Sequence, residues 1–261
     1  VEDLRTHNVA RGRIEVDLDP FAEPRRVVVA DSLCVAVRFQ QRVGHEDFVL
    51  NVVLAYKRRP LYVPLSIEAD NLERYRGQIE ALRGKILLGG SLALFYFAGT
   101  SGALYWREWL LFKNSTSFGV KDPQFNLDIS FFAFKLPMYQ ALVGWAISTL
   151  VFAIIGSAIV HYLYGGIRPQ VAQERTTVAA RVQLSVLLGL VVLLKAVAYW
   201  LDRYALALKE SRLITGLTYT DVNATLPAKS ILAAIAVICS LLFFANIVRK
   251  SWLLPAAGTA L

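Results

Sequence analysis

The sequence has few of the residues on which soluble enzymes and disulfide-linked proteins depend. Only 18% of its 261 residues are charged and 56% are hydrophobic, whereas soluble domains carry about 25% charged residues. The two cysteines, Cys34 and Cys239, are far apart and show neither a disulfide framework nor metal-ligand spacing. None of the three histidines, His7, His45 and His161, has a cysteine or a carboxylate at metal-ligand spacing. The sequence therefore predicts no metal site.

Motifs for catalysis and cofactor binding are also missing from the sequence. It contains no glycine-rich phosphate loop, no serine in a nucleophile elbow and no paired aspartates within a hydrophobic segment. The pair Gly165 and Gly166 follows a hydrophobic segment, a position where glycine typically ends a helix. The first residues lack the pattern of a cleaved signal peptide. We therefore expect no enzymatic activity and no cofactor.

Long hydrophobic segments, bounded by charged loops, are what the sequence has in abundance. Four of them cover residues 86–106, 136–163, 182–201 and 230–248. A helix of about 20 residues crosses a hydrocarbon core about 30 Å thick. Because lipid offers the backbone no hydrogen-bond partner, the backbone must form its hydrogen bonds within the helix. The sequence therefore predicts an all-α membrane protein, a helical bundle with four transmembrane helices in residues 86–261.

The distribution of basic residues predicts the orientation of these helices in a plasma membrane. Seven lysines and arginines lie between residues 57 and 85, and the positive-inside rule places such a cluster in the cytoplasm. Residues 48–85 would be a basic cytoplasmic juxtamembrane segment, and the loops 107–135 and 202–229 would face outward. Because the basic residues flank the hydrophobic segments, the net charge of +8 favours anionic lipid headgroups, and not nucleic acid, as a partner.

The outer loops mix aromatic and charged residues, which is typical of segments that lie in the headgroup layer. We therefore expect both loops to follow the membrane surface. The aromatic residues expected to anchor the first loop at the interface are Trp106, Trp109, Phe131, Phe132 and Phe134. Small residues four apart predict close packing between the spanning helices. These pairs are Gly89 with Ala93, Ala98 with Gly102, and Gly144 with Ser148.

Lys195 is the most costly polar residue within a hydrophobic segment. A charged residue near the centre of a spanning helix costs about 2.5–3.5 kcal/mol on insertion scales. Tyr199 and Asp202 lie one and two turns further along the same helix face, so the ammonium group would reach outward through Tyr199 toward Asp202. Three roles stay open for Lys195: a snorkelling or structurally paired group, the lining of a polar cavity or transport path, and catalysis.

His161 is the second intramembrane polar candidate. It falls in the last turn of the segment 136–163, where an imidazole typically serves as an anchored polar group at the inner interface. A proton relay is the alternative, since histidine titrates near neutral pH.

Residues 1–47 are expected to form an irregular segment that does not cross the membrane. The apolar run 27–37 is shorter than a span and contains Asp31. The residues after this run include further charged side chains, among them Arg38 and Arg42, which would be costly in lipid.

Five strings resemble the uncharacterised protein family 0182, which consists of large multi-span bacterial membrane proteins. The strings are LAYKRRPLYVP (54–64), FGVKDPQFNLDISFFAFKLPMY (118–139), HYLYGGIR (161–168), LLKAVAYWLDRY (193–204) and YTDVNATLPAK (219–229). Their order and spacing over residues 48–261 are similar to the family's. The resemblance implies a membrane location, no established activity, and a bundle of several spans followed by a large outer domain.

The chain departs from this pattern at both ends. Residues 1–47 do not resemble the family, and the large outer domain is missing. We therefore expect a fragment or a frame-disrupted gene model, with a divergent soluble N-terminal head as the alternative. The expected function is a membrane-embedded scaffold or anchor, alone or with other membrane subunits or further copies of the chain. The alternative is part of a transporter or channel that uses Lys195.

Overall fold

The computed structural model of the chain describes residues 22–58, part of residues 77–100, and residues 104–168, 176–209 and 216–249. The named elements are α1 (Ala22–Lys57), α3 (Trp106–Lys113), η1 (Phe131–Lys135), α4 (Leu136–Leu163), α5 (Val178–Ala205), η2 (Leu206–Leu208), η3 (Asp221–Thr225) and α6 (Leu226–Arg249). No sheet forms within these residues, which contain two isolated β-bridges. The expectation of an all-α protein is confirmed for this part of the chain.

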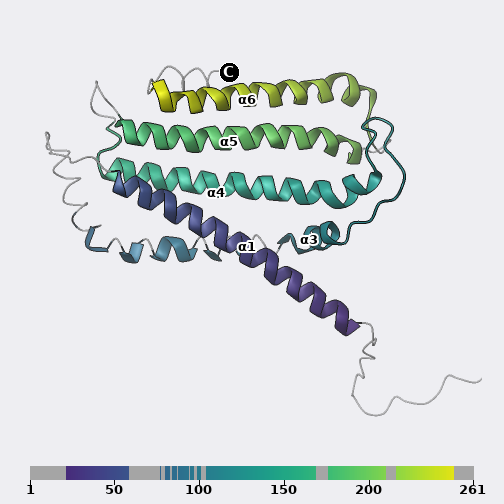
Figure 1. Cartoon of the computed structure of the whole chain (residues 1–261), viewed down its shortest axis with the longest axis horizontal. Helices are drawn as coiled ribbons and strands as arrows, with labels where there is room; N and C mark the ends of the chain where they lie inside the picture. Colours follow the sequence, from purple (N-terminus) through teal and green to yellow (C-terminus); the bar gives the residue numbers. More distant parts are fainter. Residues whose placement is uncertain are drawn as a thin grey trace, which may run out of the picture.

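Within the described part of the chain, three helices are long and apolar enough to cross a membrane. With the turns at their ends, they cover Phe131–Leu163, Val178–Leu208 and Asp221–Asn246. α4, α5 and α6 lie side by side in one layer, with α5 in the middle (Figure 1). Three of the four predicted spans are thus confirmed as long apolar helices. The fourth, residues 86–106, lies partly outside the described residues and stays a prediction; its described residues up to 100 are helical.

The expectation of an irregular segment up to residue 47 is wrong for residues 22–47, which belong to α1. Among the α1 residues from 34 onward whose burial is described, the buried positions are Gln40, Gly44, Asn51 and Ala55. Their spacing places them on one helix face, and this face packs on α4. These buried positions hold small or polar residues, so they give little hydrophobic signal, and tertiary packing decides the structure. Residues 1–21 lie outside the described part.

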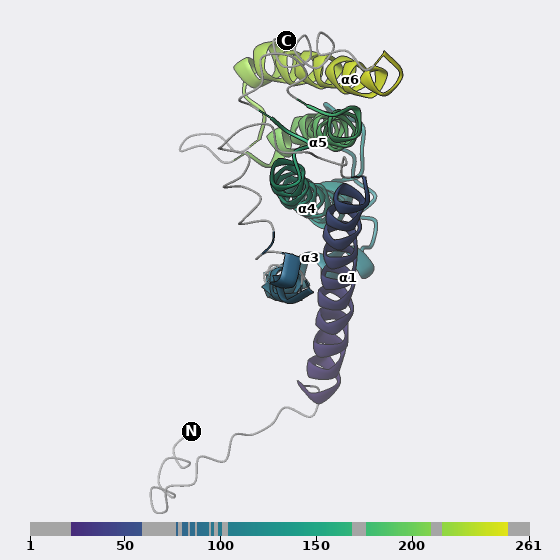
Figure 2. The ribbon, with the colours of Figure 1, turned by 90° about the vertical axis from the view of Figure 1, so that its left-hand side faces the viewer.

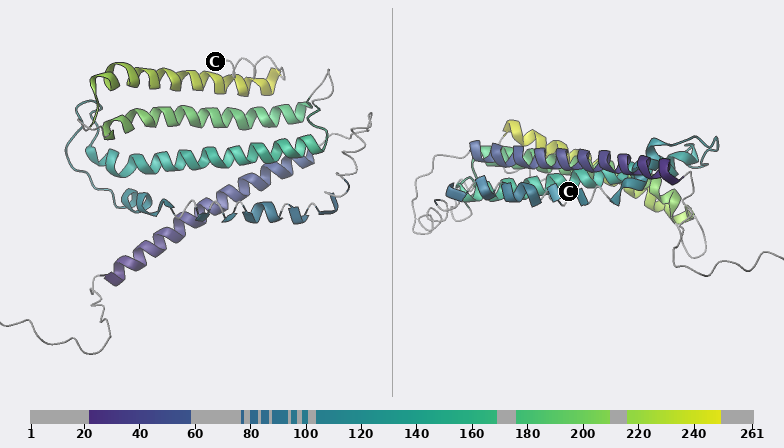
Figure 3. Two further views of the ribbon diagram at one scale, coloured as in Figure 1. Left: turned by 180° about the vertical axis from the view of Figure 1, so that it is seen from behind. Right: turned by 90° about the horizontal axis from the view of Figure 1, so that it is seen from below.

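α1 crosses α4 obliquely and reaches the layer at the end where α4 finishes (Figure 3). Viewed from the end of the bundle, α6, α5 and α4 follow one another in a row and α1 lies beside α4 (Figure 2). A Cβ atom added to Gly156 of α4 would lie 2.6 Å from the ring of Phe48 in α1. Gly156 therefore permits this close approach of the two helices.

A second glycine, Gly189, brings α5 close to α6. A Cβ atom there would lie 2.8 Å from the ring of Phe244. The small-residue pairs expected from sequence do not have this role in the described residues: Gly89 and Gly144 face open space, and Ala93 and Ser148 are exposed. Ala98 and Gly102 lie outside the described residues. Close packing thus occurs at single glycines that face large side chains on the neighbouring helix.

α4 and α6 begin in the same unusual way, with one π-helical turn followed by a Leu-Pro pair. Leu136 donates its backbone N–H to the carbonyl of Phe131, and Leu226 donates to Asp221. Proline lacks an N–H and its ring crowds the carbonyl four residues earlier in an α-helix. The wider turn just before Pro137 accommodates this change in hydrogen bonding at the start of the span.

The loop between α3 and α4 folds back onto the layer at the end where α4 begins. Phe132 is 3% exposed and packs with Leu136 and Leu201 in a small hydrophobic core. Its expected role as an interface anchor is therefore wrong, because the ring is buried in protein. Phe131 packs on Tyr204 with ring centroids 5.6 Å apart, so it also contacts the bundle.

Candidate functional site

Buried polar side chains gather where α1 and α4 end and α5 begins. The polar cluster consists of Asn51 on α1, Ser157 and His161 on α4, and Gln183 on α5. Ser157 and His161 are at most 1% exposed, Gln183 is 4% exposed and Asn51 is 9% exposed. Buried polar groups are costly unless they are hydrogen-bonded, so the pairing within the cluster decides what it does.

Gln183 connects the members of this cluster. Its Nε2 donates to the backbone carbonyl of Asn51 at 2.9 Å and to the hydroxyl of Ser157 at 3.3 Å. Its Oε1 lies 3.1 Å from Nε2 of His161. Because a backbone carbonyl can only accept, the carboxamide orientation is fixed, and His161 must carry its proton on Nε2. One side chain thus joins α5 to both α1 and α4.

The end of α4 holds His161 in place. Gly165 adopts a φ of 69°, and the N–H of Gly166 donates to the carbonyl of His161 at 2.6 Å, the pattern of a Schellman cap. A Cβ atom on Gly166 would lie 2.9 Å from Nδ1 of His161. The expectation that the glycine pair ends the helix is confirmed, and Gly166 also makes room for the imidazole.

Two further hydrogen bonds extend the polar contacts from α5 to α6. Nδ2 of Asn246 donates to the hydroxyl of Ser185 at 2.7 Å, and the hydroxyl of Ser240 donates to the carbonyl of Gly189 at 2.9 Å. Asn246 is fully buried and Ser240 is 1% exposed. The helices α1, α4, α5 and α6 are therefore linked by polar contacts as well as by packing.

The cluster has the geometry of a structural hydrogen-bond network. Gln183 uses both amide protons and its oxygen within the protein. Among the described residues, no group of three histidines, cysteines or carboxylates is placed to hold a metal ion. The sequence identified His161 but missed its partners, because uncharged polar residues within apolar helices give only a weak signal.

The structure brings Lys195 and Tyr199 together but connects Asp202 to other groups. Nζ of Lys195 lies 5.6 Å from the centroid of the Tyr199 ring, within range of a cation–π contact. Asp202 pairs with Lys229 at 3.5 Å and accepts from Gln140 at 3.4 Å. The expected chain from Lys195 through Tyr199 to Asp202 is wrong at its last step, because Lys229 on α6 is the cation beside that carboxylate.

Sequence reasoning also missed an ion pair between a buried carboxylate and a half-exposed lysine at the end where α6 begins. Asp221 is 2% exposed, and Lys209 approaches its two oxygens at 3.0 and 3.2 Å. The N–H of Asp221 donates to the Thr218 hydroxyl, and the N–H of Thr218 donates to the Asp221 carboxylate. These reciprocal bonds form a capping box, and the spacing of Thr218 and Asp221 before an apolar run was the available signal.

Asp128 organises the loop before α4 in a similar way. Its carboxylate accepts from the Ser117 hydroxyl and from the backbone N–H groups of Phe118, Gly119 and Ser130. The Ser117 hydroxyl and then the Ser130 N–H hold the pKa of Asp128 well below its usual range, because they bond to the charged form. The ionised carboxylate therefore stabilises this loop.

Comparison with known proteins identifies the relatives of this chain. A 50% identical protein of Nocardioides aligns over 212 residues, which are 81% of this chain and 21% of the relative. A Streptomyces coelicolor protein is 49% identical over 216 residues, which are 81% of this chain and 22% of the relative. Both carry the name UPF0182 protein. The chain spans about a fifth of the length of these curated relatives, and no solved structure matches it.

The family model for the uncharacterised protein family UPF0182 matches residues 33–261. The match begins before residue 48, so residues 33–47, which were expected not to resemble the family, are included in it. These residues form part of α1 and contain Gln40 and Gly44 of its packed face. With most of its length matched by the family model, the chain belongs to the uncharacterised family UPF0182.

Proposed function

We propose that this chain is a membrane-embedded scaffold, which forms a helical platform and anchors a longer protein in the bilayer. One observation carries the proposal: Gln183 hydrogen-bonds to partners on both α1 and α4. Lipid tails are as apolar as leucine, so helices in a membrane associate through close packing and polar contacts. Gln183 supplies such contacts at the point where three helices meet.

The length of the relatives supports an anchoring role. This chain corresponds to about a fifth of each aligned relative, so most of such a protein lies outside the matched region. The three apolar helices would hold that remainder at a plasma membrane. The basic residues between 57 and 85 would lie in the cytoplasm against anionic lipid headgroups, which places the polar cluster at the cytoplasmic side.

The exposed faces of the layer are the proposed contact surfaces for lipid, other membrane subunits or further copies of the chain. Large apolar side chains on these faces include Phe152, Ile155, Ile159, Leu193, Val197, Ile238 and Leu241. Such faces are suited to lipid tails or to another apolar helix.

The transporter or channel alternative depends on Lys195, and its position gives that alternative no support. Lys195 is exposed on the surface of α5 and leans toward the Tyr199 ring. It does not line the two cavities described beside α1. A substrate or coupling-ion site in a transporter lies within the protein, near the middle of the bilayer.

The scaffold proposal is tested by Gln183→Leu, with Gln124→Leu in an exposed loop as the matched control. Interhelical hydrogen bonds in membranes contribute about 0.6–1.7 kcal/mol each, so Gln183→Leu should lower the aggregation temperature in detergent by roughly 5 °C. The control should match the parent. In proteoliposomes, any ion flux through the parent should not depend on Lys195, so Lys195→Met should leave the flux unchanged. An unchanged aggregation temperature for Gln183→Leu, or a flux dependent on Lys195, would overturn the proposal.

A further inference from the structure

Lys195 carries a positive charge at the middle of a candidate span, on an exposed face of α5. It lies 17 residues after Val178 and 13 residues before Leu208, the two ends of that span. Its side chain is exposed, and so is Leu188, two turns earlier on the same helix face. α4 and α6 flank α5 within the layer, and α1 lies beside α4 (Figure 2). This face of α5 is therefore accessible to another molecule in the membrane.

The contact that Nζ of Lys195 makes among the described residues is with the ring of Tyr199, whose centroid lies 5.6 Å away. A ring face attracts a cation but does not neutralise its charge. Asp202, two turns along the helix, pairs with Lys229 instead. The ammonium group is thus held at the protein surface without a carboxylate, in the part of a span where a charge is most costly.

The depth of Lys195 restricts what can neutralise it. At about 1.5 Å per residue, it lies roughly 3 Å from the midpoint of the span. The headgroups bound a hydrocarbon core about 30 Å thick, so they are farther away than the four-carbon stem of a lysine extends. Lipid phosphate therefore does not reach this ammonium group.

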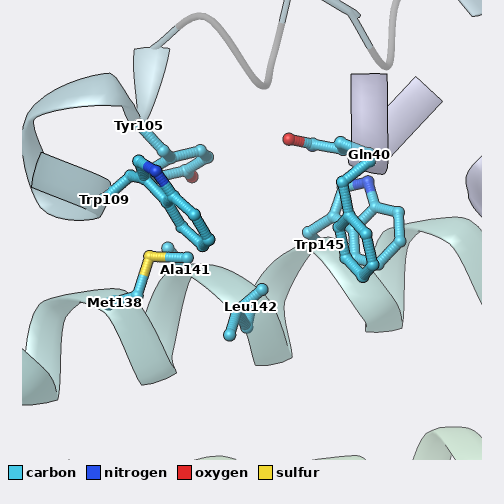
Figure 4. Close-up of a pocket in the computed structure, with 8 residues that line it drawn as sticks. Gln40, Tyr105, Trp109, Met138, Ala141, Leu142 and Trp145 are labelled. Carbon is cyan, nitrogen blue, oxygen red and sulfur yellow. The ribbon is translucent and has the colours of Figure 1, made fainter. Parts of the chain in front are cut away.

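The cavities of the structure do not serve Lys195 either. The cavity between α1, α3 and α4 has an apolar lining, which includes Trp109 and Met138 (Figure 4). α5 contributes no residue to this lining or to that of the second cavity beside α1. An anion at the depth of Lys195 must then belong to a protein segment within the bilayer. Such a segment is a helix, because lipid leaves no other way to satisfy its backbone.

This chain does not supply that anion from its own hydrophobic segments. Aspartate and glutamate are absent from residues 86–106, 136–163, 182–201 and 230–248. In α1, Glu46 pairs with Arg42 and Asp47 accepts a hydrogen bond from Asn51. A second copy of the chain therefore brings no free carboxylate to Lys195. The aligned relatives, of which this chain covers about a fifth, have ample length for a further helix.

We propose that the face of α5 formed by Leu188, Lys195 and Tyr199 binds a membrane-spanning helix from outside this chain, which carries a carboxylate at mid-membrane depth. The carboxylate pairs with Nζ of Lys195, and apolar side chains of the partner cover Leu188. Polar residues within spans typically pair with one another between helices. This inference rests on the scaffold role and deepens it, because it names the chemistry of a helix that the platform receives.

The experiment measures how the full chain associates with two model helices that differ in one residue. Both are leucine-rich spanning peptides with an acceptor dye at each end, and the central residue is glutamate in one and glutamine in the other. The donor dye is attached to a cysteine introduced at Asn223, in a background without Cys34 and Cys239. Energy transfer is measured in phosphatidylcholine vesicles at pH 7. The parent should bind the glutamate helix about tenfold more tightly, the effect of one strong interhelical polar contact.

Variants of the chain assign this preference to Lys195. Lys195→Met should remove the preference without lowering the aggregation temperature, and Lys195→Arg should keep it. Lys113→Met, at an exposed position outside the three candidate spans, should behave as the parent. Equal affinity of the parent for the two helices would overturn the inference, as would a preference that survives in Lys195→Met.

Two further measurements test the depth and the identity of the partner. A peptide whose glutamate is moved two turns toward one end should lose the preference, and equally tight binding would contradict a site at mid-membrane depth. Energy transfer between copies of the chain that Lys195→Met abolishes would assign this face to a second copy and overturn the inference. The scaffold role is tested separately, because it depends on the aggregation temperature of Gln183→Leu and not on peptide binding.

Discussion

Gln183 of α5 donates a hydrogen bond of 2.9 Å to the backbone carbonyl of Asn51 in α1, a residue 132 positions earlier in the chain. This contact joins a helix with charged residues along its exposed side to a layer of three apolar helices. The same carboxamide contacts Ser157 and His161 on α4. The end of the bundle therefore depends on one side chain whose polar atoms are all used.

The contact between α1 and α4 predicts a strong effect of a single methyl group at Gly156. Gly156→Ala would place a Cβ atom 2.6 Å from the Phe48 ring, and overpacking of this kind costs about 1–3 kcal/mol. The thermal aggregation temperature in detergent should fall. Gly144→Ala on the same helix is the matched control, because its Cβ atom would meet open space, and it should be neutral or stabilising by up to about 1 kcal/mol. Equal behaviour of the two variants would contradict this packing.

Much of the transmembrane region could be predicted from the sequence, whereas α1 could not. Segments 136–163, 182–201 and 230–248 are long and apolar, and the lipid requirement for a helix then leaves little choice. α1 packs through small and polar residues such as Gly44 and Asn51, which hydropathy does not detect. Its partner Gln183 is distant in sequence. Phe132 differs from the predicted position at the membrane surface because no pattern in its loop indicates that the loop folds back onto the bundle.

The pairing of Asp202 with Lys229 leads to a prediction about charge coupling. Asp202→Ala and Lys229→Met should each cost at most about 1 kcal/mol, because the carboxylate is 41% exposed. Their effects on the aggregation temperature should be less than additive in the double variant. Lys195→Met combined with Asp202→Ala should be additive, since these residues are not partners. Non-additive effects for Lys195 with Asp202, together with additive effects for Asp202 with Lys229, would contradict this pairing. They would favour the link from Lys195 to Asp202 that the sequence predicts.

The lowered pKa of Asp128 leads us to expect that acid destabilises the loop before α4. Its folded pKa lies below the unfolded value of about 3.9, so its contribution to stability is present above about pH 4 and is lost as the pH falls through the folded pKa. Asp128→Asn should therefore lower the melting temperature at pH 7. The melting temperature of this variant should then fall less than that of the parent between pH 5 and pH 3. Thermal melts followed by circular dichroism at several pH values provide the measurement. An identical acid dependence in parent and variant would show that Asp128 does not stabilise the loop.

The orientation is tested by labelling in intact cells. In a background without Cys34 and Cys239, cysteines introduced at Asn114 and at Asn223 should react with a membrane-impermeant maleimide. Both positions are exposed. Asn114 follows α3 and Asn223 lies in the π-helical turn η3 before α6, at the side of the membrane that the basic residues between 57 and 85 predict to be outside. Labelling only after cell lysis would reverse the orientation, and labelling of one position alone would contradict the arrangement of α5 between the two loops.

Hydrogen exchange of α1 in nanodiscs tests the central claim most directly, which is that Gln183 fixes α1 onto the spanning helices. In the parent, the amides of residues 44–55 should exchange slowly, because this part of α1 packs on α4 and its carbonyl at Asn51 is bound by Gln183. Gln183→Leu should accelerate exchange in this stretch while the centres of α4 and α5 stay protected. Unchanged protection of residues 44–55 in the variant would contradict the account, since α1 would then be held without this hydrogen bond.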